Sequence, residues 1–436
     1  MDFALLPEFY DSLDRQFNVT NADLTNATYT NVDSNFVFSA KYPRHRWFNY
    51  KEGFSPVLVE GVFNEYNLDK TAIVCDPFCG AGTTLAVAKA KGMMSIGFEV
   101  NPFAAFISRV KTDDYSDKDI AEFQSLLEDL SKIDFTATRD LPENEYLQRI
   151  FEKEMLIAQL NIRHFLVNLE ESKSRNLLYF AWLCTLEECS LFRKAGNGLK
   201  IKKHPPEYHE GDAGKFAVQT IQKKASSMVE DYSCEDNGPV PEIIVDSVTT
   251  MNKQVAPNSL DLVLFSPPYA NCFDYTKIYY LELWFGGYVN TVTDQKEIRM
   301  KSLRSHCHAT WPERYSDFHL PPLNDEILPL LKQQSLWTDR IPDMLNGYFA
   351  DMKESLRQIY NALKPGGHCS IVVSNSAYAG IIIPTDVFLA MIAETLGYRV
   401  HEIAVERLII TSSQQYKKTE HIRKYLRESI VKLEKP

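Results

Sequence analysis

A short apolar segment followed by a glycine-rich turn and a helix of small residues limits this chain to few folds. Residues 71–75, TAIVC, have the length and composition of a buried strand, and 83–92, TTLAVAKAKG, have a helical pattern that Gly92 ends. A second strand follows at 94–100, and Pro102 stands at the first turn of the next helix. Strand, turn, helix and strand in this order predict a parallel sheet with crossover helices.

The same alternation returns in the second half of the chain. The predicted elements there are strands at 241–247, 259–265, 368–374, 398–410 and 428–435, and helices at 273–285, 348–364 and 385–397. We therefore predict an α/β fold with a doubly wound, mostly parallel sheet.

Three segments differ in character from these elements. Residues 1–40 are polar and rich in Asn and Thr, which predicts an N-terminal arm, either loose or packed as a cap. Residues 113–239 carry long charged and Leu-rich stretches, which predict a helical insertion, and 290–345 lack clean periodicity and form an irregular insertion. The α/β domain would then comprise 41–112 and 240–436.

Composition and charge narrow the class of protein. The chain has 436 residues, of which 44% are hydrophobic and 24% charged, and this composition argues against disorder. Its net charge is −11, so any nucleic-acid surface must gather basic residues on one face. There is no signal peptide, no apolar stretch long enough for a membrane span and no disulfide framework among the eight cysteines. We expect a cytoplasmic protein of a prokaryote or phage that has no membrane contact.

The motif His306-Cys307-His308 is the one sequence cluster that resembles a metal site. No matching CxxC or HxxxH spacing is found elsewhere, and adjacent residues rarely ligate one ion together. We therefore expect no metal.

The glycine-rich turn predicts a binding site for a nucleoside. Asp76 stands at the tip of the first strand, and Gly80 and Gly82 let the backbone approach a ligand. The next strand ends in Glu99, 99 − 76 = 23 residues on, at the offset where a carboxylate accepts hydrogen bonds from ribose hydroxyls. Without a ligand, the same pattern would be a tight strand-to-helix turn.

The details of this turn favour one cofactor over the common nucleotides. No Lys follows Gly82, which disfavours a triphosphate, and Leu85 replaces the third glycine of dinucleotide sites. Asp76 offers a negative partner to a cation, and Phe78 offers a cation–π contact, as a sulfonium such as S-adenosylmethionine requires. Asp246, at the end of a third strand, would reach the adenine amino group or merely cap the following turn.

The tetrapeptide Ser266-Pro267-Pro268-Tyr269 ends the strand at 259–265, on the same predicted sheet edge. The prolines lack N–H groups, so the Pro267 carbonyl and the Ser266 hydroxyl form two rigid acceptors that suit an exocyclic amine. Positioned in this way, the amine would attack a sulfonium methyl group in line, while the base stacks on Tyr269. A base inside a duplex must be flipped out to reach such a site. Without a substrate, the motif would be a Pro-Pro turn with a serine cap.

These motifs resemble those of the amino-methylating DNA methyltransferases. The tetrapeptide resembles their catalytic motif, and serine in first place is usual in the cytosine-N4 branch. The segment KEGFSPVLVEGVF resembles their contact to the methionine end of the cofactor, which implicates Phe54 and Ser55. The loop that resembles their methyl-donor loop comprises Asp76, Pro77, Phe78, Cys79, Gly80, Ala81, Gly82, Thr83 and Thr84.

The resemblance implies a Rossmann-like class I methyltransferase with catalytic residues Ser266, Pro267, Pro268 and Tyr269. It further implies S-adenosylmethionine as the methyl donor, S-adenosylhomocysteine as the product and double-stranded DNA as the substrate. A cognate restriction enzyme encoded nearby is a possible partner of such a protein. Many serine-type cytosine-N4 enzymes place the tetrapeptide before the donor loop, whereas here it follows by 266 − 76 = 190 residues. Adenine N6 is therefore the second expectation. An RNA amine and a non-catalytic nucleic-acid binder are the further alternatives.

The remaining expectation concerns the surface that holds DNA. We predict that recognition lies in the two insertions, 113–239 and 290–345. The basic residues expected to contact phosphates are Arg44, Arg46, Lys200, Lys202, Lys203 and Arg304.

Overall fold

The central sheet confirms the doubly wound prediction. The computed structural model describes residues 3–21, 41–51, 53–196, 198–232, 238–311, 315, 317–409 and 413–436. Eight strands lie in the order β1-β11-β12-β8-β7-β2-β3-β6. They are β1(Val19–Asn21), β2(Ile73–Asp76), β3(Met94–Phe98), β6(Glu242–Ile244), β7(Leu260–Phe265), β8(Leu363–Ser374), β11(Arg399–Leu408) and β12(Arg427–Glu434).

The strand directions match a Rossmann-like class I methyltransferase fold. β8, β7, β2, β3 and β6 are parallel neighbours, and β12 lies antiparallel between β8 and β11. The two strands predicted at the end of the chain, at 398–410 and 428–435, are thus present and form an antiparallel pair. The chain winds outward from β2 in one direction and from β7 in the other, so the strand order reverses between these two strands.

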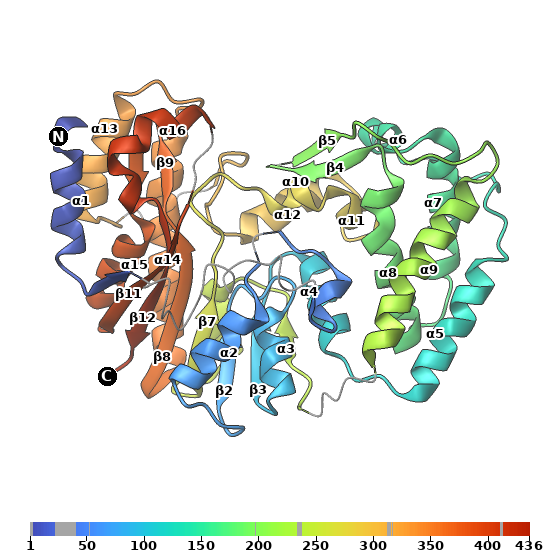
Figure 1. Cartoon of the computed structure of the whole chain (residues 1–436), viewed down its shortest axis with the longest axis horizontal. Coiled ribbons are helices and arrows are strands. Elements are labelled where there is room, and N and C mark those ends of the chain that lie inside the picture. Colours follow the sequence, from blue (N-terminus) through green and yellow to red (C-terminus); the bar gives the residue numbers. More distant parts are fainter. Residues whose placement is uncertain are drawn as a thin grey trace.

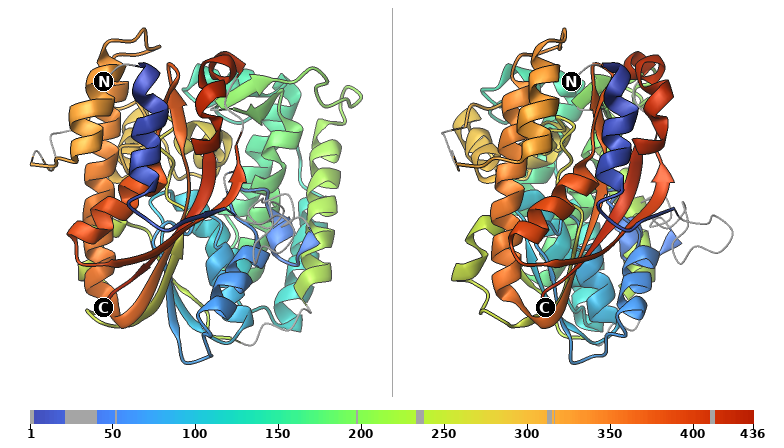
Figure 2. Two further views of the ribbon diagram at one scale, coloured as in Figure 1. Left: turned by 60° about the vertical axis from the view of Figure 1, so that its left-hand side comes forward. Right: turned by 90° about the vertical axis from the view of Figure 1, so that its left-hand side faces the viewer.

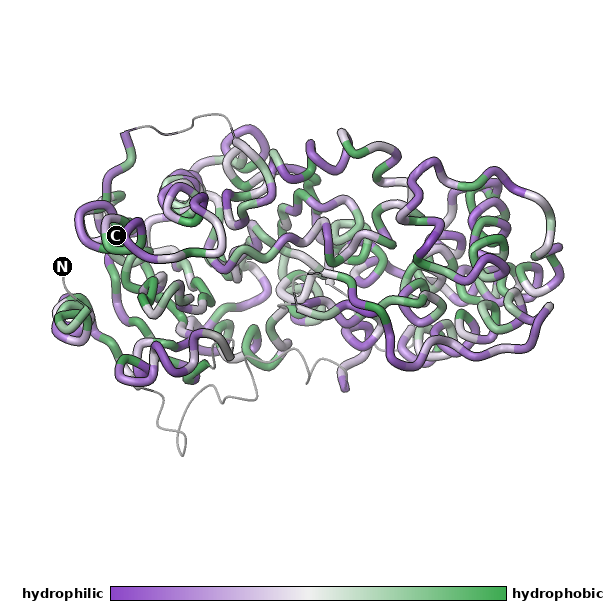
Figure 3. Tube along the Cα trace, turned by 90° about the horizontal axis from the view of Figure 1, so that it is seen from above, coloured by the Kyte–Doolittle hydropathy of each residue, from purple (hydrophilic) through white to green (hydrophobic). Residues whose placement is uncertain are grey.

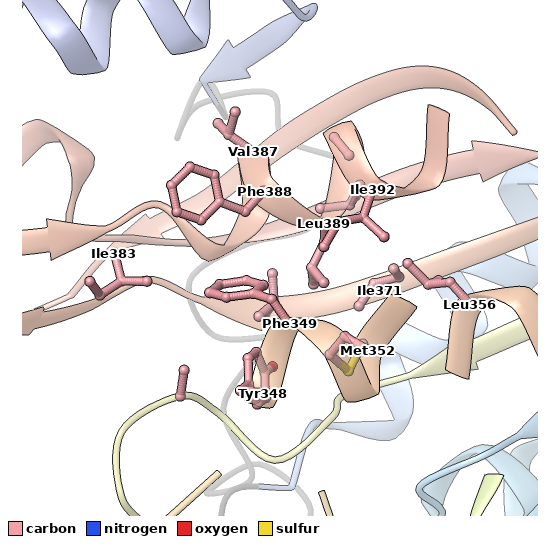
Figure 4. Packing of buried hydrophobic residues seen from close by; sticks show 14 of the residues in the cluster. Tyr348, Phe349, Met352, Leu356, Ile371, Ile383, Val387, Phe388, Leu389 and Ile392 are labelled. Carbon is pink, nitrogen blue, oxygen red and sulfur yellow. The ribbon is translucent and has the colours of Figure 1, made fainter. Parts of the chain in front are cut away.

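Helices cover both faces of the sheet (Figure 1). One face carries α2(Pro56–Glu65) and α3(Thr83–Ala90), and the opposite face carries α14(Ile341–Ala362), α15(Thr385–Thr395) and the 3₁₀ segment η4(Val248–Lys253). Alternate strand residues separate the two cores. Leu262 and Leu264 pack with α2 and α3, whereas Val263 and Phe265 pack with α14. Figure 4 shows the second core, where Phe349 of α14 meets Phe388 of α15 edge to face.

A second lobe consists of helices and a hairpin, as the sequence predicted for the helical insertion (Figure 1). It joins the sheet through α4(Pro102–Thr112), whose cap residue Asn101 accepts hydrogen bonds from two backbone amides. Figure 3 shows hydrophobic residues concentrated on the inner sides of these helices. The elements are α5(Asp117–Leu130), α6(Glu145–Ile150), α7(Lys153–Val167), α8(Lys173–Cys189), β4(Phe192–Ala195), β5(Gly198–Ile201) and α9(Ala213–Tyr232).

The segment after β7 differs from its prediction. One helix was expected at 273–285, but Tyr279 leaves helical geometry and divides it in two. The irregular insertion at 290–345 contains further helices. In this part of the chain the structure has α10(Tyr275–Ile278), α11(Tyr280–Phe285), α12(Val292–Lys301), the π-helical turn η5(Pro322–Ile327) and α13(Leu328–Lys332).

The start of the chain is part of the domain rather than a loose arm. Residues 3–21 form η1(Phe3–Leu5), α1(Leu6–Asp14) and β1, which adds a parallel strand beside β11. The Tyr10 hydroxyl bonds the backbone of Ile382, and Tyr425 bonds the Pro7 carbonyl. Figure 2 shows α1 lying against this C-terminal part of the molecule. Residues 22–40 of the predicted arm lie outside the described residues.

The remaining elements are η3(His45–Trp47), the hairpin of β9(Ser376–Tyr378) and β10(Ile381–Ile383), α16(Ser413–Thr419) and η6(Glu420–Tyr425). None of the helices in the described ranges has the length and apolar character needed to cross a membrane.

Candidate active site

Four strands bring separate segments to one edge of the sheet. The carboxyl ends of β2, β3, β6 and β7 lead into Asp76, Glu99, Asp246 and Ser266. A cleft lies at this edge, and its lining includes residues of the glycine loop and of the tetrapeptide. The cleft therefore lies where the strand order reverses, the usual ligand position in doubly wound sheets.

Asp76 ties the two ends of the glycine loop together. One carboxylate oxygen accepts the Phe78 amide at 3.1 Å, and the other accepts the Thr84 hydroxyl at 2.7 Å. The side chain is 1% exposed and is not part of the cleft lining, and burial raises its pKa to about 7. In this structure Asp76 shapes the loop from behind, and its predicted contact to the cofactor stays a prediction.

Helix α4 supports the same loop from below, which the sequence did not reveal. The Ser108 hydroxyl donates to the Gly80 carbonyl at 3.3 Å, and the Lys111 ammonium donates to the Ala81 carbonyl at 2.8 Å. A Cβ on Gly82 would lie 2.2 Å from Ser108 Oγ, and Gly82 has a φ of +74°. Burial lowers the pKa of Lys111 to about 7. Spacing on α4 alone gave no signal for these contacts, because they depend on how α4 crosses the loop.

Glu99 lies on the cleft wall with both oxygens held. Its carboxylate accepts the Gly80 amide at 2.9 Å and the Asn101 amide at 2.8 Å, and burial raises its pKa to about 7. Asp246 also lines the cleft, but it accepts the Ser247 amide and the Thr250 hydroxyl. Asp246 therefore both faces the cleft and caps the following turn.

The other predicted cofactor residues divide between the cleft and its support. Phe54, Pro77, Phe78 and Thr83 line the cleft. Ser55 is fully buried, and its hydroxyl accepts the Leu58 amide at the start of α2. Ser55 and Thr84 are not part of the cleft lining.

The tetrapeptide begins where β7 ends. The Ser266 hydroxyl and Pro268 line the cleft, and the Ser266 hydroxyl donates to the Tyr269 hydroxyl at 3.3 Å. Pro267 is buried, and the half-buried Tyr269 packs against the core of the α14 face. Phe273 and Tyr275, which follow the tetrapeptide, also line the cleft and form an edge-to-face pair.

The opposite wall comes from a segment that the sequence had left unexplained. Residues at the end of α12 and just beyond it line the cleft, namely Ile298, Lys301, Ser302, Leu303, Ser305 and His306. The Cys272 amide donates to the Ser305 carbonyl at 3.1 Å and joins this segment to the tetrapeptide loop. Lys301 is exposed and is the cationic side chain of this wall.

Asp274, His306 and His308 place possible metal ligand atoms within 4.8 Å of one another. Asp274 however already has partners inside the chain. It accepts two hydrogen bonds from Thr276 on one oxygen, and its other oxygen pairs with Arg299 Nε at 3.0 Å. A metal ion would have to share that oxygen with the positively charged guanidinium, so these residues fit an internal ion pair better than a metal.

Four of the six basic residues predicted to contact DNA have structural partners inside the chain. Arg44 is 7% exposed and donates to the carbonyls of Lys111 and Asp113, and Arg46 pairs with Glu230 and Asp231. These bonds fix the 44–47 segment to the ends of α4 and α9.

Lys202 and Arg304 are the other two of these four residues, and each stabilises local structure. Lys202 donates to three carbonyls at the end of α8, and Arg304 pairs with Asp351 at 2.8 Å. Lys200 and Lys203 are exposed.

The fold and the cleft define an α/β protein with a nucleoside-type site beside a polar, proline-rigid loop. Comparison with known proteins agrees with this class. The family model described as DNA methylase, which covers the N6 and N4 amino-methylating enzymes, matches residues 32–109. Those residues include α2, the glycine loop, Glu99 and most of α4.

Similar proteins match almost the whole chain. Type II methyltransferase M.BsoBI of Geobacillus stearothermophilus is 28% identical, with 90% of this chain and 86% of that protein covered. Type II methyltransferase M.AvaI of Anabaena variabilis is also 28% identical, with 90% and 87% covered. Type II methyltransferase M.MvaI of Kocuria varians is 21% identical, with 82% of each chain covered. Over most of its length the chain is therefore similar to proteins named Type II methyltransferases, and its glycine-loop segment matches the DNA methylase family model.

Proposed function

We propose that this protein transfers a methyl group from S-adenosylmethionine to cytosine N4 in double-stranded DNA, at a base flipped into the cleft. One observation carries this proposal. Ser266 and Pro268 line the same cleft as Gly80 and Glu99, so a donor site and an amine site open onto one space.

The donor half of the cleft fits the proposed cofactor. The Glu99 carboxylate accepts the Gly80 and Asn101 amides, and a bond from the Val100 amide also lowers its pKa. A carboxylate has about four acceptor sites, so Glu99 keeps acceptor capacity for a ribose hydroxyl. Phe54, Phe78 and Val248 supply apolar walls for a base and a thioether chain. When bound, S-adenosylmethionine would supply an electrophilic methyl group, and S-adenosylhomocysteine would be the product.

The residues of the tetrapeptide would hold and activate the amine. The Ser266 hydroxyl directs its proton to Tyr269, so its lone pairs are left to accept an amine N–H. The Pro267 carbonyl would accept the other amine N–H from a turn stiffened by two prolines. Accepting both bonds draws the nitrogen towards tetrahedral geometry and localises its lone pair. The amine proton is then passed to water.

The flipped base needs a stacking face and an anchor for its phosphate. Tyr269 is the predicted stacking residue, although it is not part of the cleft lining, and Phe273 and Tyr275 offer aromatic rings in the cleft. We assign Lys301 as the residue that binds the phosphate of the flipped nucleotide, because it is exposed at the cleft wall.

The names of the relatives support a site-specific DNA substrate. All three are called Type II methyltransferases, which supports a role beside a restriction enzyme that cuts the same sequence. The choice of cytosine rests on serine in first place of the tetrapeptide, and adenine N6 is the alternative within the same family.

The test is to incubate the protein with isotope-labelled cofactor and DNA, digest to nucleosides and identify the labelled nucleoside by mass. We expect N4-methylcytosine. N6-methyladenine would overturn the base assignment but keep the amine mechanism. Label in RNA and not in DNA, or DNA binding without any transfer by the intact cleft, would overturn the proposed function itself.

A further inference from the structure

The β4–β5 hairpin of the helical lobe has two chemically different faces. Cross-strand pairing places Phe192 opposite Ile201 and Lys194 opposite Leu199 on one face. Arg193 lies opposite Lys200 on the other face. Side chains of a strand alternate between faces, so the two sets point in opposite directions.

The first face is anchored in the protein. Lys194 forms a buried ion pair with Glu282 and lies 5.1 Å from the ring centroid of Tyr279. Tyr279 stacks on Tyr50, which lines the cleft beside Gly80. Lys202, just after β5, is bonded to the end of α8 as described above. The hairpin is therefore a fixed platform whose Lys194 face is packed against the aromatic wall of the active site.

The second face carries two like charges side by side. Arg193 and Lys200 are exposed and directly opposite each other, an arrangement that destabilises an isolated hairpin. Within the ranges that the structure describes, neither side chain forms an ion pair. A Cβ added to Gly198 would meet nothing within 4 Å, so there is open space beside this position of β5. The next exposed cation is Lys203.

The hairpin also lies beside the entrance for a substrate. β5 packs against α10, whose residues Tyr275 and Thr276 line the cleft. Figure 1 shows the hairpin extending from the helical lobe above α10 and α12, towards the other lobe. A polyanion whose reacting group entered the cleft would pass this face.

We propose that Arg193 and Lys200 bind the phosphate backbone of the DNA duplex next to the flipped base. This inference rests on the proposed function and names the surface that holds its substrate. Phosphate contacts of this kind position the duplex without reading its sequence. The hairpin's paired cations are then stabilised by bound phosphates rather than by any residue of the described chain.

The test compares two double variants that remove the same charge. The test variant is Arg193→Gln with Lys200→Gln. The control is Lys70→Gln with Lys91→Gln, two exposed lysines at the amino ends of β2 and β3, the opposite edge of the sheet. Binding of a fluorescently labelled DNA duplex is measured over a series of salt concentrations. Cofactor affinity by calorimetry reports that each variant is folded.

The measured quantity is the slope of the logarithm of the binding constant against the logarithm of the salt concentration. We expect this slope to be shallower in the test variant by about 0.9 per lost phosphate contact, or about 1.8 in all, for every DNA sequence. The control should keep the slope of the unchanged protein, and both variants should bind cofactor normally. An unchanged slope in the test variant would overturn the inference, as would an equal loss in both variants.

This result is separable from the proposed function. If the unchanged protein methylates cytosine and the hairpin variant keeps its salt slope, only the hairpin assignment is wrong. If the hairpin variant loses the slope but the unchanged protein transfers no methyl group, DNA binding by this face stands and the catalytic proposal is wrong. If the unchanged protein binds an acidic protein or RNA but not duplex DNA, both are wrong.

Discussion

The two walls of the cleft are built in different ways. Most of the donor wall comes from one continuous stretch, residues 76–111, which forms the glycine loop, Glu99 and α4, while Phe54 and Val248 are added from other segments. The target wall joins two separate segments, 266–276 and 298–306. In the donor wall, polar groups bond the backbone of the loop itself, as Glu99 does with Gly80. In the target wall, the Ser266 hydroxyl has a side-chain partner and keeps acceptor capacity. A wall that binds the same ligand in every reaction cycle can have its polar groups bonded in advance. A wall that acts on a substrate needs hydrogen-bond acceptors that are still available to that substrate.

The largest expected effect removes the amine acceptor from the target wall. Ser266→Ala should lower the rate of methyl transfer by roughly 100-fold or more, as loss of a preorganised polar group at a reacting centre does. Single-turnover transfer of labelled methyl to DNA measures this. Cofactor affinity should be unchanged, because the donor wall is intact. A similar loss of cofactor affinity would show that the two walls do not act separately.

The next largest effect is expected from a substitution in the glycine loop of the donor wall. Gly82→Ala forces a Cβ to within 2.2 Å of Ser108 Oγ at a φ of +74°, so cofactor affinity should fall by more than about tenfold. Calorimetric titration with S-adenosylhomocysteine measures it. Gly92→Ala is the matched control, since Gly92 has a φ of +76° but only one neighbour, at 3.8 Å. It should lower stability without changing affinity, and equal losses of affinity in both variants would refute the role of the α4 contact.

Lys111 makes the free energy of unfolding of the protein depend on pH. Burial lowers its pKa from 10.5 to about 7, so the folded chain binds fewer protons than the unfolded chain between these values. Its contribution to the free energy of unfolding therefore rises as pH increases from 7 to 10.5, by up to about 1.4 kcal/mol per pH unit. Lys111→Met should remove that rise, as measured by denaturant unfolding across this range. Lys91→Met, at an exposed position, is the control. A difference between the unchanged protein and Lys111→Met that is constant with pH would contradict this account.

The smallest expected effect distinguishes the role of the aromatic ring of Tyr269 from that of its hydroxyl group. Tyr269→Phe keeps the aromatic face but removes the partner of Ser266, a single hydrogen bond worth about 1 kcal/mol. Transfer should fall roughly fivefold, whereas Tyr269→Ala should reduce it much further. Equal effects of the two changes would mean that the hydroxyl, and not the ring, is the important part.

Most of the donor wall could be predicted from the sequence. The offset between Asp76 and Glu99 is informative because one crossover helix joins β2 to β3, and their register pairs Asp76 with Gly97. Glu99 therefore lies just beyond the strand end. The glycines are visible because positive φ restricts the residue type. The tetrapeptide was visible for a similar reason, since two prolines fix their own backbone.

The rest of the site could not be predicted in this way. Lys111 and Ser108 contact backbone carbonyls across a helix crossing, and the 298–306 segment meets the cleft only after the chain has folded back. The positive charge of a side chain was the weakest basis for predicting a contact with DNA. Arg44 and Lys202 looked like phosphate ligands, yet their partners are carbonyls inside the chain.

The sequence by itself determined the α/β alternation, the glycine loop with Glu99 and the rigid acceptor tetrapeptide, because each follows from local backbone preference and short spacing. Only the tertiary structure decided that Asp76 supports the loop from behind, that α12 completes the target wall, and that Arg193 and Lys200 remain exposed while Arg44 is buried. Whether a charged side chain meets a carbonyl, a carboxylate or solvent depends on residues far away in the chain. That information is present only once the elements are packed together.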